Sequence, residues 1–371
     1  MRAPAVHPVV IAAGGTGGHF FPAEALAGEL LARGRRIALM TDARSAGLQS
    51  AVFARLEQFV ISGGGIAGHG ALGAARSAAG LAVGVAQARS IISACNASAV
   101  VGFGGYPCVA PVLAARLMRR RPGVILHEQN AVLGRANRFL ARYADALALS
   151  FAATARVPET AATVVTGNPV RPAIAALAGQ PYVPPGNRIN LLVLGGSLGA
   201  RVFSDVVPPA LTALPDTLRA RLAVVQQCRQ EDLERVRIAY GDAGIDATLA
   251  PFFADVAEKL AAAHLVIARA GASTVAELAI AGRPAILVPL PAAIDDHQSA
   301  NARALVEARG ASMIAQPALT PEALTERLVA WLGAPELLAH AAHATRGVAR
   351  SDATARLADL VEDLMRQEAW P

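Results

Sequence analysis

Glycine clusters stand directly after three apolar runs in this sequence, and the first of them is Gly14-Gly15-Thr16-Gly17-Gly18-His19. It follows the run Val9–Ala13 and precedes a helical pattern, so backbone N–H groups and the helix dipole would both favour an anion there. Glycine also lets a diphosphate approach the backbone closely. The spacing is neither a dinucleotide fingerprint nor a P-loop, since position 20 is Phe20 and no G-K-[ST] follows. A tight turn without a ligand stays open as the alternative.

The other two glycine clusters widen the choice of chemistry. Gly102-Phe103-Gly104-Gly105-Tyr106 ends a strand pattern in the same half of the chain, so in a parallel sheet it would share an edge with the first cluster. The third, Gly195-Gly196-Ser197-Leu198-Gly199, is compatible with a phosphate turn and with the G-x-S-x-G elbow of serine hydrolases, whose acid and base would be Asp295-Asp296-His297. We favour the phosphate turn, because Ser197 ends the first strand of a second half.

Charged and amide side chains follow two later strand patterns. Arg269 ends one of them, and Ser273 is a suitable N-cap for the helix that follows. Glu277 lies one turn into that helix, where a carboxylate can accept two ribose hydroxyls, as in dinucleotide sites. A helix-dipole or surface role for Glu277 is the alternative. The segment Asp295–Asn301 follows the next strand pattern and brings amides that suit sugar hydroxyls.

Metal chemistry has little support in this sequence. The Asp295-Asp296 pair could hold a divalent cation, but no D-x-D motif occurs, which argues against a metal-dependent sugar-nucleotide site of that kind. His340 and His343 are three positions apart on a predicted helix, and two ligands do not make a zinc site. The three cysteines, Cys95, Cys108 and Cys228, are widely spaced and indicate a reducing compartment.

The elements that must position these residues alternate between buried strands and helices, which predicts two doubly wound α/β domains. The first half has strand patterns at Val9–Ala13, Ile37–Thr41, Val100–Phe103, Val124–His127 and Ala146–Ser150. The second has them at Ile189–Leu194, Leu222–Gln226, Ala247–Phe252, Leu265–Arg269, Pro284–Pro289 and Ser312–Ala315. We expect domains at 1–168 and 169–349, with a C-terminal helix at about 350–371 packing back on the first domain.

Composition is that of a globular protein of two domains, with 371 residues, 54% hydrophobic and 17% charged. The net charge of +6 should attract anions, whether phosphorylated small molecules, acidic membranes or nucleic acids. The apolar run Val9–Ala13 is too short for a signal peptide. The charge-free stretch Ser90–Ala115 contains glycines and prolines, so we expect strand, turn and helix there, and no membrane span.

Together the motifs resemble those of the undecaprenyldiphospho-muramoylpentapeptide β-N-acetylglucosaminyltransferases, a family of peptidoglycan glycosyltransferases. Each motif alone is weak, but the ordered set covers both halves and is specific. The set comprises Gly14–His19, Gly102–Tyr106, His127–Asn130, Gly167–Arg171, Gly195–Arg201, Arg269–Glu277, Asp296–Gln298 and Asn301. Departures from the commonest family pattern occur at Leu198, Ala270 and Cys108, and none of them removes an essential charge.

The resemblance implies a GT-B fold, in which two Rossmann-like domains face each other across a cleft that holds the active site. The donor would be UDP-N-acetylglucosamine and the acceptor a lipid-linked muramoyl-pentapeptide, with no cofactor, metal or nucleic acid. The implied donor residues are Thr16, Gly17, Gly18, Asn130, Arg171, Ser197, Phe253, Arg269, Ala272, Glu277, Gln298 and Asn301. The acceptor residues would be Gly14, Gly15, Gly104, Gly105 and Tyr106, and the catalytic residues His19, Asn130 and Arg269. Asn137 is a further cleft residue without an assigned role.

Within the donor set, the resemblance places the main chain of Phe253 at uracil, Glu277 at ribose, and Ser197 and Arg269 at the diphosphate. Ala272, Gln298 and Asn301 would lie near the sugar.

The expected reaction is an inverting displacement, in which the muramoyl 4-hydroxyl attacks the anomeric carbon as UDP leaves and gives a β-1,4 bond. His19 is the candidate base, because imidazole accepts a proton near neutral pH. Arg269 should matter more than the helix dipole, since a charge-assisted hydrogen bond contributes ~1.5–3 kcal/mol against ~0.3–1 for the dipole. A sugar-nucleotide epimerase of the same architecture and a non-catalytic binder of UDP-sugar or lipid stay open.

The polyprenyl acceptor implies peripheral attachment to the cytoplasmic face of the bacterial inner membrane. The candidate surface is Ala71–Ile92, where apolar side chains alternate with arginines. Its residues are Leu72, Arg76, Leu81, Val85 and Arg89, joined by Arg116, Arg119, Arg120 and Arg121 on the next predicted helix. A solvated basic helix face is the alternative.

Overall fold

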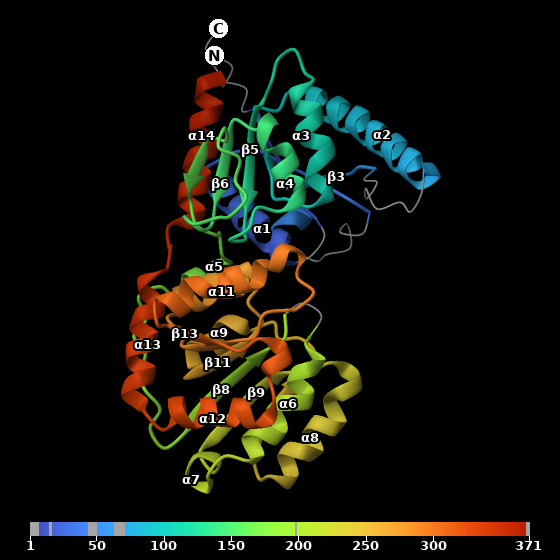
Figure 1. The fold of residues 1–371 in the computed structure, drawn as a ribbon. Helices are drawn as coiled ribbons and strands as arrows, with labels where there is room; N and C mark the ends of the chain where they lie inside the picture. The colour runs from blue at the N-terminus through green and yellow to red at the C-terminus, as the bar shows by residue number, and fades with distance from the viewer. Residues whose placement is uncertain (1–6, 15–16, 44–49, 63–70, 197–198, 369–371) are drawn as a thin grey trace. The chain divides into compact units, whose positions relative to one another are not determined.

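The computed structural model describes residues 7–14, 17–43, 50–62, 71–196 and 199–368. The chain divides into two compact units, one of Met1–Arg171 with Asp352–Pro371 and the other of Pro172–Ser351. Each unit contains one parallel β-sheet with helices on both faces (Figure 1). The boundary falls after Arg171, slightly later than the predicted one.

Unit 1 is built on a seven-stranded parallel sheet in the order β3-β2-β1-β4-β5-β6-β7. The strands are β1 Val9–Ala12, β2 Ile37–Thr41, β3 Glu57–Val60, β4 Ala99–Gly102, β5 Gly123–Glu128, β6 Ala146–Leu149 and β7 Thr163–Val165. The helices are α1 Gly17–Ala32, α2 Ala71–Cys95, α3 Val109–Arg116, α4 Arg135–Leu140 and α14 Ala353–Glu368. All five predicted strands are present, and the edge strands β3 and β7 are additions.

The side chains of β1 point alternately to the two faces of the sheet, which explains why helices cover both faces. Val9 and Ile11 pack in one core cluster with residues of α1 and α14. Val10 and Ala12 point to the opposite face and pack with residues of α2 and α3. Successive strand side chains alternate between faces, so a strand that is apolar throughout requires helices on both sides.

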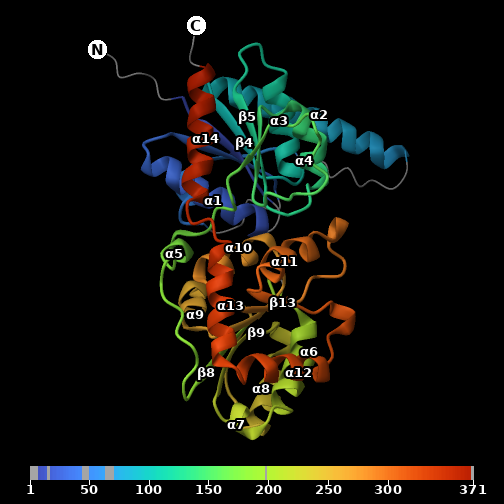
Figure 2. The same cartoon turned by 60° about the vertical axis from the view of Figure 1, so that its left-hand side comes forward.

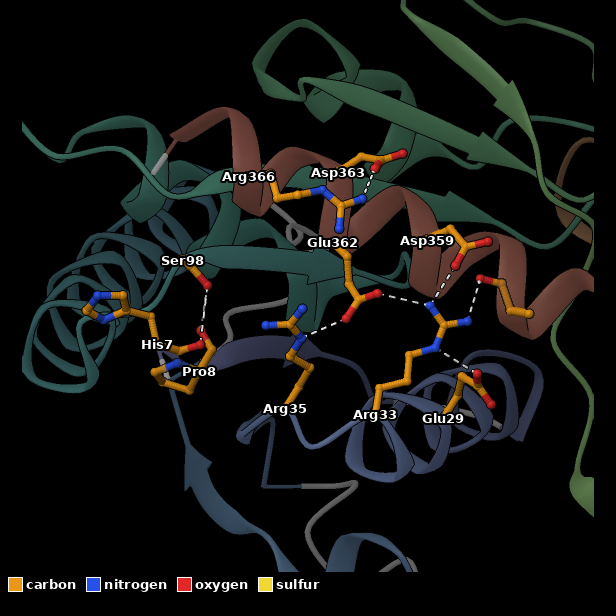
Figure 3. Close-up of polar contacts among 11 residues, drawn as sticks. His7, Pro8, Glu29, Arg33, Arg35, Ser98, Asp359, Glu362, Asp363 and Arg366 are labelled. Carbon is orange, nitrogen blue, oxygen red and sulfur yellow. Dashed lines mark hydrogen bonds and ion pairs between the residues drawn. The ribbon is translucent and has the colours of Figure 1, made fainter. Parts of the chain in front are cut away.

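The helix α14 completes unit 1, although 180 residues of unit 2 precede it in the chain. It lies against α1, β4 and β5 (Figure 2). Leu357, Ala358 and Val361 belong to the same core cluster as Ile11. Figure 3 shows the polar contacts at its edge, where Arg33 and Arg35 donate to carboxylates of α14.

Unit 2 contains a six-stranded parallel sheet in the order β10-β9-β8-β11-β12-β13. The strands are β8 Ile189–Leu194, β9 Leu222–Gln227, β10 Asp246–Ala250, β11 Leu265–Ala268, β12 Ala285–Leu287 and β13 Ala311–Met313. The helices are α5 Pro172–Ala175, α6 Arg201–Thr212, α7 Asp216–Arg219, α8 Leu233–Asp242, α9 Val256–Ala262, α10 Ala272–Ala281, α11 His297–Glu307, α12 Pro321–Leu332 and α13 Pro335–Gly347. Its largest core cluster joins strand residues to α6, α8 and α12, through Ile267, Phe203, Tyr240 and Trp331 among others.

Candidate functional site

The strand order of each sheet reverses at its centre, and ligands of open α/β sheets bind at the carboxyl ends of strands beside such a reversal. In unit 1 the reversal lies between β1 and β4, where Ala12 pairs with Gly102. In unit 2 it lies between β8 and β11, where Leu194 pairs with Ala268. Each predicted glycine turn therefore follows one of the strands that flank a reversal.

The first glycine turn leads into α1. Gly14 is buried at the end of β1 and Gly17 opens the helix, while Gly15 and Thr16 lie outside the described residues. A methyl group on Gly17 would stand 2.9 Å from Cε2 of Phe21, so any other residue there would make that ring shift. The guanidinium of Arg171, the last residue of unit 1 before unit 2 begins in the sequence, lies 4.9 Å from the centre of the Phe21 ring.

The second glycine turn lies beside His19. Gly104 and Gly105 have φ angles of +85° and +70°, which favour glycine. Methyl groups built on them would lie 3.5 Å from Cε1 and 3.7 Å from Cδ2 of His19. Cys108 donates from Sγ to the carbonyl of Gly105 across 3.0 Å. A serine hydroxyl is also a donor, so a serine in place of Cys108 would have the same hydrogen-bonding capacity toward this carbonyl. Tyr106 is 42% exposed next to this turn.

A buried carboxylate, Glu128 at the end of β5, fixes the residues that follow it. Its Oε1 accepts from the backbone N and from Nδ2 of Asn130, at 3.0 and 3.1 Å. Its Oε2 accepts from Gly134 N and from Asn137 Nδ2, both at 2.9 Å. Asn137 Nδ2 also donates to the carbonyl of His127. Glu128 thus orients Asn130 and Asn137, a role that its place in the motif His127–Asn130 did not reveal.

Arg269, directly after β11, is tied to the neighbouring strand end. Its Nη1 donates to the carbonyls of Val288 and Pro289 at 3.1 and 3.2 Å, and its Nη2 donates to Oε1 of Gln316 at 2.6 Å. The side chain is 8% exposed, and burial lowers its pKa. A guanidinium carries five N–H donors, so these three hydrogen bonds leave capacity for a ligand. Gln316 was not identified from the sequence.

Residues of α10 and α11 join the same edge of the sheet. Asn301 is fully buried and donates from Nδ2 to the carbonyl of Ala270 at 3.1 Å. Gln298 accepts at Oε1 from Leu290 N at 2.9 Å, which fixes the loop after β12. Ala272 and Glu277 are buried on α10.

The expectation that Ser273 caps α10 is wrong. The helix begins at Ala272 and its N-cap is Gly271, because Ser273 already has helical geometry within the first turn. The Oγ of Ser273 is buried without a hydrogen-bond partner among the described residues.

The glycine turn of unit 2 is held by a residue that the sequence did not single out. Gln227, at the end of β9, accepts at Oε1 from Gly195 N and donates from Nε2 to the carbonyls of Gly196 and Pro251, at 3.0, 2.9 and 3.1 Å. It thereby links the turn to the segment that contains Phe253, which is buried with Lys259 4.9 Å from its ring centre. Ser197 and Leu198 lie outside the described residues.

The Asp295-Asp296 pair adopts left-handed backbone geometry, with φ angles of 56° and 51°. Asp296 Oδ1 accepts from Ser299 Oγ at 2.7 Å, and His297 Nδ1 lies 2.8 Å from the carbonyl of Ile294. Within the described ranges, no group of three or more His, Cys, Asp or Glu side chains is arranged to hold a metal ion.

The basic surface of unit 1 differs from the predicted one. Leu81 and Val85 are only partly exposed, because they pack against the core beside α3, and Leu72 lies outside the described side chains. Arg119–Arg121 follow the end of α3 and are not helical. The exposed apolar side chains here are Val83, at 51%, and Leu117, at 62%.

One helix of unit 1, α2, bears on the expectation that the chain has no membrane span. Its residues Gly73–Cys95 are long and apolar enough, by length and composition, to cross a membrane. The window includes Arg76 and Arg89, and one face of the helix packs on α3. Length and composition alone do not distinguish a membrane span from an apolar helix of a globular domain, so the expectation stays a prediction.

Comparison with known proteins identifies the family. Residues 9–149 match the N-terminal domain of glycosyltransferase family 28, and residues 190–362 match its C-terminal domain. A relative from Granulibacter bethesdensis is 62% identical over 363 residues, which make up 97% of this chain and 94% of that protein. It is named UDP-N-acetylglucosamine--N-acetylmuramyl-(pentapeptide) pyrophosphoryl-undecaprenol N-acetylglucosamine transferase. The chain belongs to this transferase family.

Two further relatives agree with the family assignment. A transferase of the same name from Gluconobacter oxydans is 53% identical over 361 residues, covering 97% of this chain and 99% of that protein. The crystal structure of Acinetobacter baumannii MurG has a TM-score of 0.78 at 33% identity, covering 96% of this chain and 99% of that one. The predicted family and the predicted GT-B fold are confirmed, and the hydrolase interpretation of Ser197 loses its support.

Proposed function

We propose that this transferase moves N-acetylglucosamine from UDP-N-acetylglucosamine to the 4-hydroxyl of undecaprenyl-diphospho-N-acetylmuramoyl-pentapeptide in peptidoglycan synthesis. Membership of the family over nearly the whole chain carries this proposal. The protein is accordingly a hexosyltransferase, as the sequence predicted. The anomeric carbon loses its bond to the diphosphate and gains a bond to the acceptor oxygen, and the acceptor proton leaves to a base.

The donor is assigned to unit 2. A diphosphate at the β8/β11 reversal would meet the N-terminus of α10, the Oγ of Ser273 and the remaining N–H groups of Arg269. We assign the ribose to Glu277, the uracil to the main chain at Phe253, and the sugar to Ala272, Gln298 and Asn301. Ser197 remains an expected diphosphate contact.

The acceptor is assigned to unit 1. Its diphosphate would approach the two glycine turns at the β1/β4 reversal, where Gly104 and Gly105 leave the backbone open. His19 lies beside the second turn and is the proposed base, and Asn130 is the proposed partner of a reacting hydroxyl. Thr16, Gly17, Gly18 and Arg171 remain expected donor contacts from this unit.

We further propose that unit 1 attaches peripherally to the cytoplasmic face of the inner membrane. The surface that supports this is revised from the predicted one. It consists of the exposed arginines Arg76 and Arg89 of α2 and Arg119–Arg121 after α3, with Val83 and Leu117 as exposed apolar side chains. Charge and apolar contact act together at such interfaces.

An acceptor-dependence assay tests the reaction. UDP-N-acetylglucosamine is incubated with the full chain, with and without the lipid-linked muramoyl acceptor, and the products are separated. Acceptor-dependent transfer with release of UDP supports the proposal. Isomerisation without acceptor indicates an epimerase, and saturable binding without turnover indicates a binding protein; either result would contradict it.

Replacement of His19 tests the base. General base catalysis contributes ~10²–10⁴-fold, so His19→Ala should lower kcat by that amount. A kcat within a few-fold of the wild type would exclude the assignment and leave the transferase activity unaffected.

A further inference from the structure

Four polar groups of unit 1 form a continuous hydrogen-bonded series that ends at His19. The carbonyl of Gly167 lies 3.1 Å from His127 Nε2, and His127 Nδ1 lies 3.0 Å from Gln129 Nε2. The Oε1 of Gln129 lies 2.8 Å from His19 Nδ1. These residues come from the ends of β5 and β7 and from the first turn of α1, which meet at the carboxyl edge of the sheet.

The orientation of the Gln129 amide follows from its backbone neighbours. Its Nε2 also lies 3.0 Å from the carbonyl of Phe103 and 3.2 Å from the carbonyl of His127. Carbonyl oxygens accept but cannot donate, so the NH₂ group of Gln129 must face them. The amide oxygen is therefore the atom that faces His19. The side chain is 1% exposed, which fixes this orientation by packing as well.

The protonation of His127 follows in the same way. Its Nε2 faces the Gly167 carbonyl and must carry a proton to donate to it. Its Nδ1 faces the NH₂ group of Gln129 and must be an acceptor. Burial lowers the pKa of His127 to about 4, so this ring is neutral at physiological pH and has one proton only.

The last hydrogen bond determines the tautomer of His19. An amide oxygen accepts and cannot donate, so Nδ1 of His19 must carry the proton that it shares with Gln129. In the neutral ring, Nε2 then holds a lone pair. That edge of the ring lies alongside the second glycine turn, since Nε2 is 3.8 Å from where a methyl group on Gly105 would stand.

We propose that Gln129 and His127 are positioning residues that hold His19 in the Nδ1–H tautomer, with Nε2 available to accept the proton of the acceptor hydroxyl. This inference rests on the proposed function. In the step, the sugar O–H bond breaks and its proton passes to Nε2. The sugar oxygen bonds to the anomeric carbon, and the electron pair of the carbon–diphosphate bond leaves with UDP. The imidazolium that results keeps its Nδ1–H donated to Gln129, and no second proton moves.

The first measurement is the tautomer itself, read without substrate from ¹⁵N NMR of the histidine-labelled full chain. The His19 signals are those lost in His19→Gln. A protonated, pyrrole-type Nδ1 and an unprotonated, pyridine-type Nε2 are expected in the wild type. A predominant Nε2–H form would overturn the proposal, whatever the chain catalyses.

The second measurement separates positioning from packing through three variants. Gln129→Leu removes the acceptor of Nδ1–H and should populate the Nε2–H form of His19. Because an imidazole in the wrong tautomer cannot act as base, kcat should fall at least ~10-fold. The KM for UDP-N-acetylglucosamine should stay within about two-fold of wild type. Gln129→Glu retains an oxygen toward Nδ1, and as the neutral acid it also supplies one donor toward the carbonyls of Phe103 and His127, so at a pH where it is protonated it should restore the Nδ1–H form and part of kcat. Gln58→Leu removes another amide of unit 1, on the exposed edge strand β3, and should leave both measurements unchanged.

The outcomes distinguish this inference from the proposed function. A wild type that transfers no sugar contradicts the function, while the spectrum still reports on the tautomer. Transfer by the wild type, together with unchanged tautomer and kcat in Gln129→Leu, overturns the positioning role only.

Discussion

The carboxylate of Glu362 on α14 accepts from Nε of Arg35, after α1, across 2.6 Å, although 327 positions separate the two residues. The other oxygen of Glu362 accepts from Nη1 of Arg33 at 3.1 Å (Figure 3). The Glu362 side chain is only 13% exposed. This arrangement attaches the last helix to unit 1 through charge as well as apolar contact.

Replacing Glu362 should destabilise unit 1. Hydrogen bonds to charged groups contribute ~1.5–3 kcal/mol, and Glu362→Ala also leaves two half-buried guanidiniums without this partner. We expect a loss of about 1–3 kcal/mol in the free energy of unfolding, measured by urea denaturation. Asp363→Ala on the same helix removes an exposed pair with Arg366 and should cost less than about 1 kcal/mol. Equal losses in the two variants would contradict the role given to Glu362.

The contribution of Glu362 should depend on pH. Burial raises its pKa, but the hydrogen bonds from Arg35 and Arg33 outweigh that effect and leave the pKa below the ordinary 4.5. A lowered carboxyl pKa stabilises the folded state fully above the unfolded value and no longer does so once the pH falls through the folded value. The difference in stability between wild type and Glu362→Gln should therefore be largest near neutral pH and shrink below about pH 4.

Protonation of His127 should also lower the free energy of unfolding as the pH falls, in a higher pH range than that of Glu362. Burial sets its pKa at about 4, against 6.5 for the unperturbed ring, so between these values the unfolded chain binds a proton that the folded chain does not. The wild type should lose on the order of 3 kcal/mol between about pH 6.5 and 4 from this residue. His127→Gln should lose correspondingly less over that range in chemical denaturation, whereas His343→Gln, at an exposed position, should behave as wild type.

Glu277→Ala should raise the KM for UDP-N-acetylglucosamine by ~10–100-fold, the equivalent of one or two hydrogen bonds to a charged acceptor. Inhibition by UDP and by 2′-deoxy-UDP provides the direct measurement. Wild type should prefer UDP and the variant should not discriminate. Equal inhibition of the wild type by both nucleotides would show that the ribose assignment is wrong. Glu258→Ala, at an exposed position on α9, is the control.

Changing Arg119, Arg120 and Arg121 to Ser should weaken sedimentation with anionic vesicles at low salt. Each basic residue near such a surface contributes about 1 kcal/mol, so a loss of roughly two orders of magnitude in affinity is expected. Salt should weaken binding of the wild type as well. Unchanged binding would disprove this surface and leave the transferase proposal intact.

A variant with the same change in net charge controls for general electrostatics. Arg188, Arg219 and Arg237 all lie on unit 2, and each pairs with a carboxylate. Their combined replacement by Ser should leave vesicle binding near that of wild type. Equal weakening by both triple variants would assign the effect to net charge and not to the proposed surface.

Strands buried on both faces were predictable from the sequence, because their side chains are apolar throughout. The sequence missed the edge strands β3 and β7, whose side chains are largely exposed. β3 begins with Glu57 and Gln58, so no apolar run marks it, and β7 has only three residues. The glycine turns were visible for the opposite reason, since positive φ at Gly104 and Gly105 selects a residue type.

The residues that hold the site residues in place by hydrogen bonds were not predictable. Gln129, Gln227 and Gln316 act through hydrogen bonds to groups far away in the sequence, and glutamine carries no local pattern that indicates such a partner. The exposure of Val83, and not of Leu81 or Val85, was not predictable for a related reason. Leu81 and Val85 are apolar residues on a helix, and only tertiary contact decides which face of α2 packs on α3.

The position of α14 also determines the order in which the two units can complete folding during synthesis. Unit 2 is one continuous stretch, Pro172–Ser351, and all its strands leave the ribosome before Leu357 and Val361 do. Domains fold as units during translation, so unit 2 can finish folding while unit 1 still lacks the helix that covers β4 and β5. A released chain truncated after Ser351 would therefore carry a protease-resistant second unit and a first unit with exposed apolar surface, the kind of intermediate that chaperones bind.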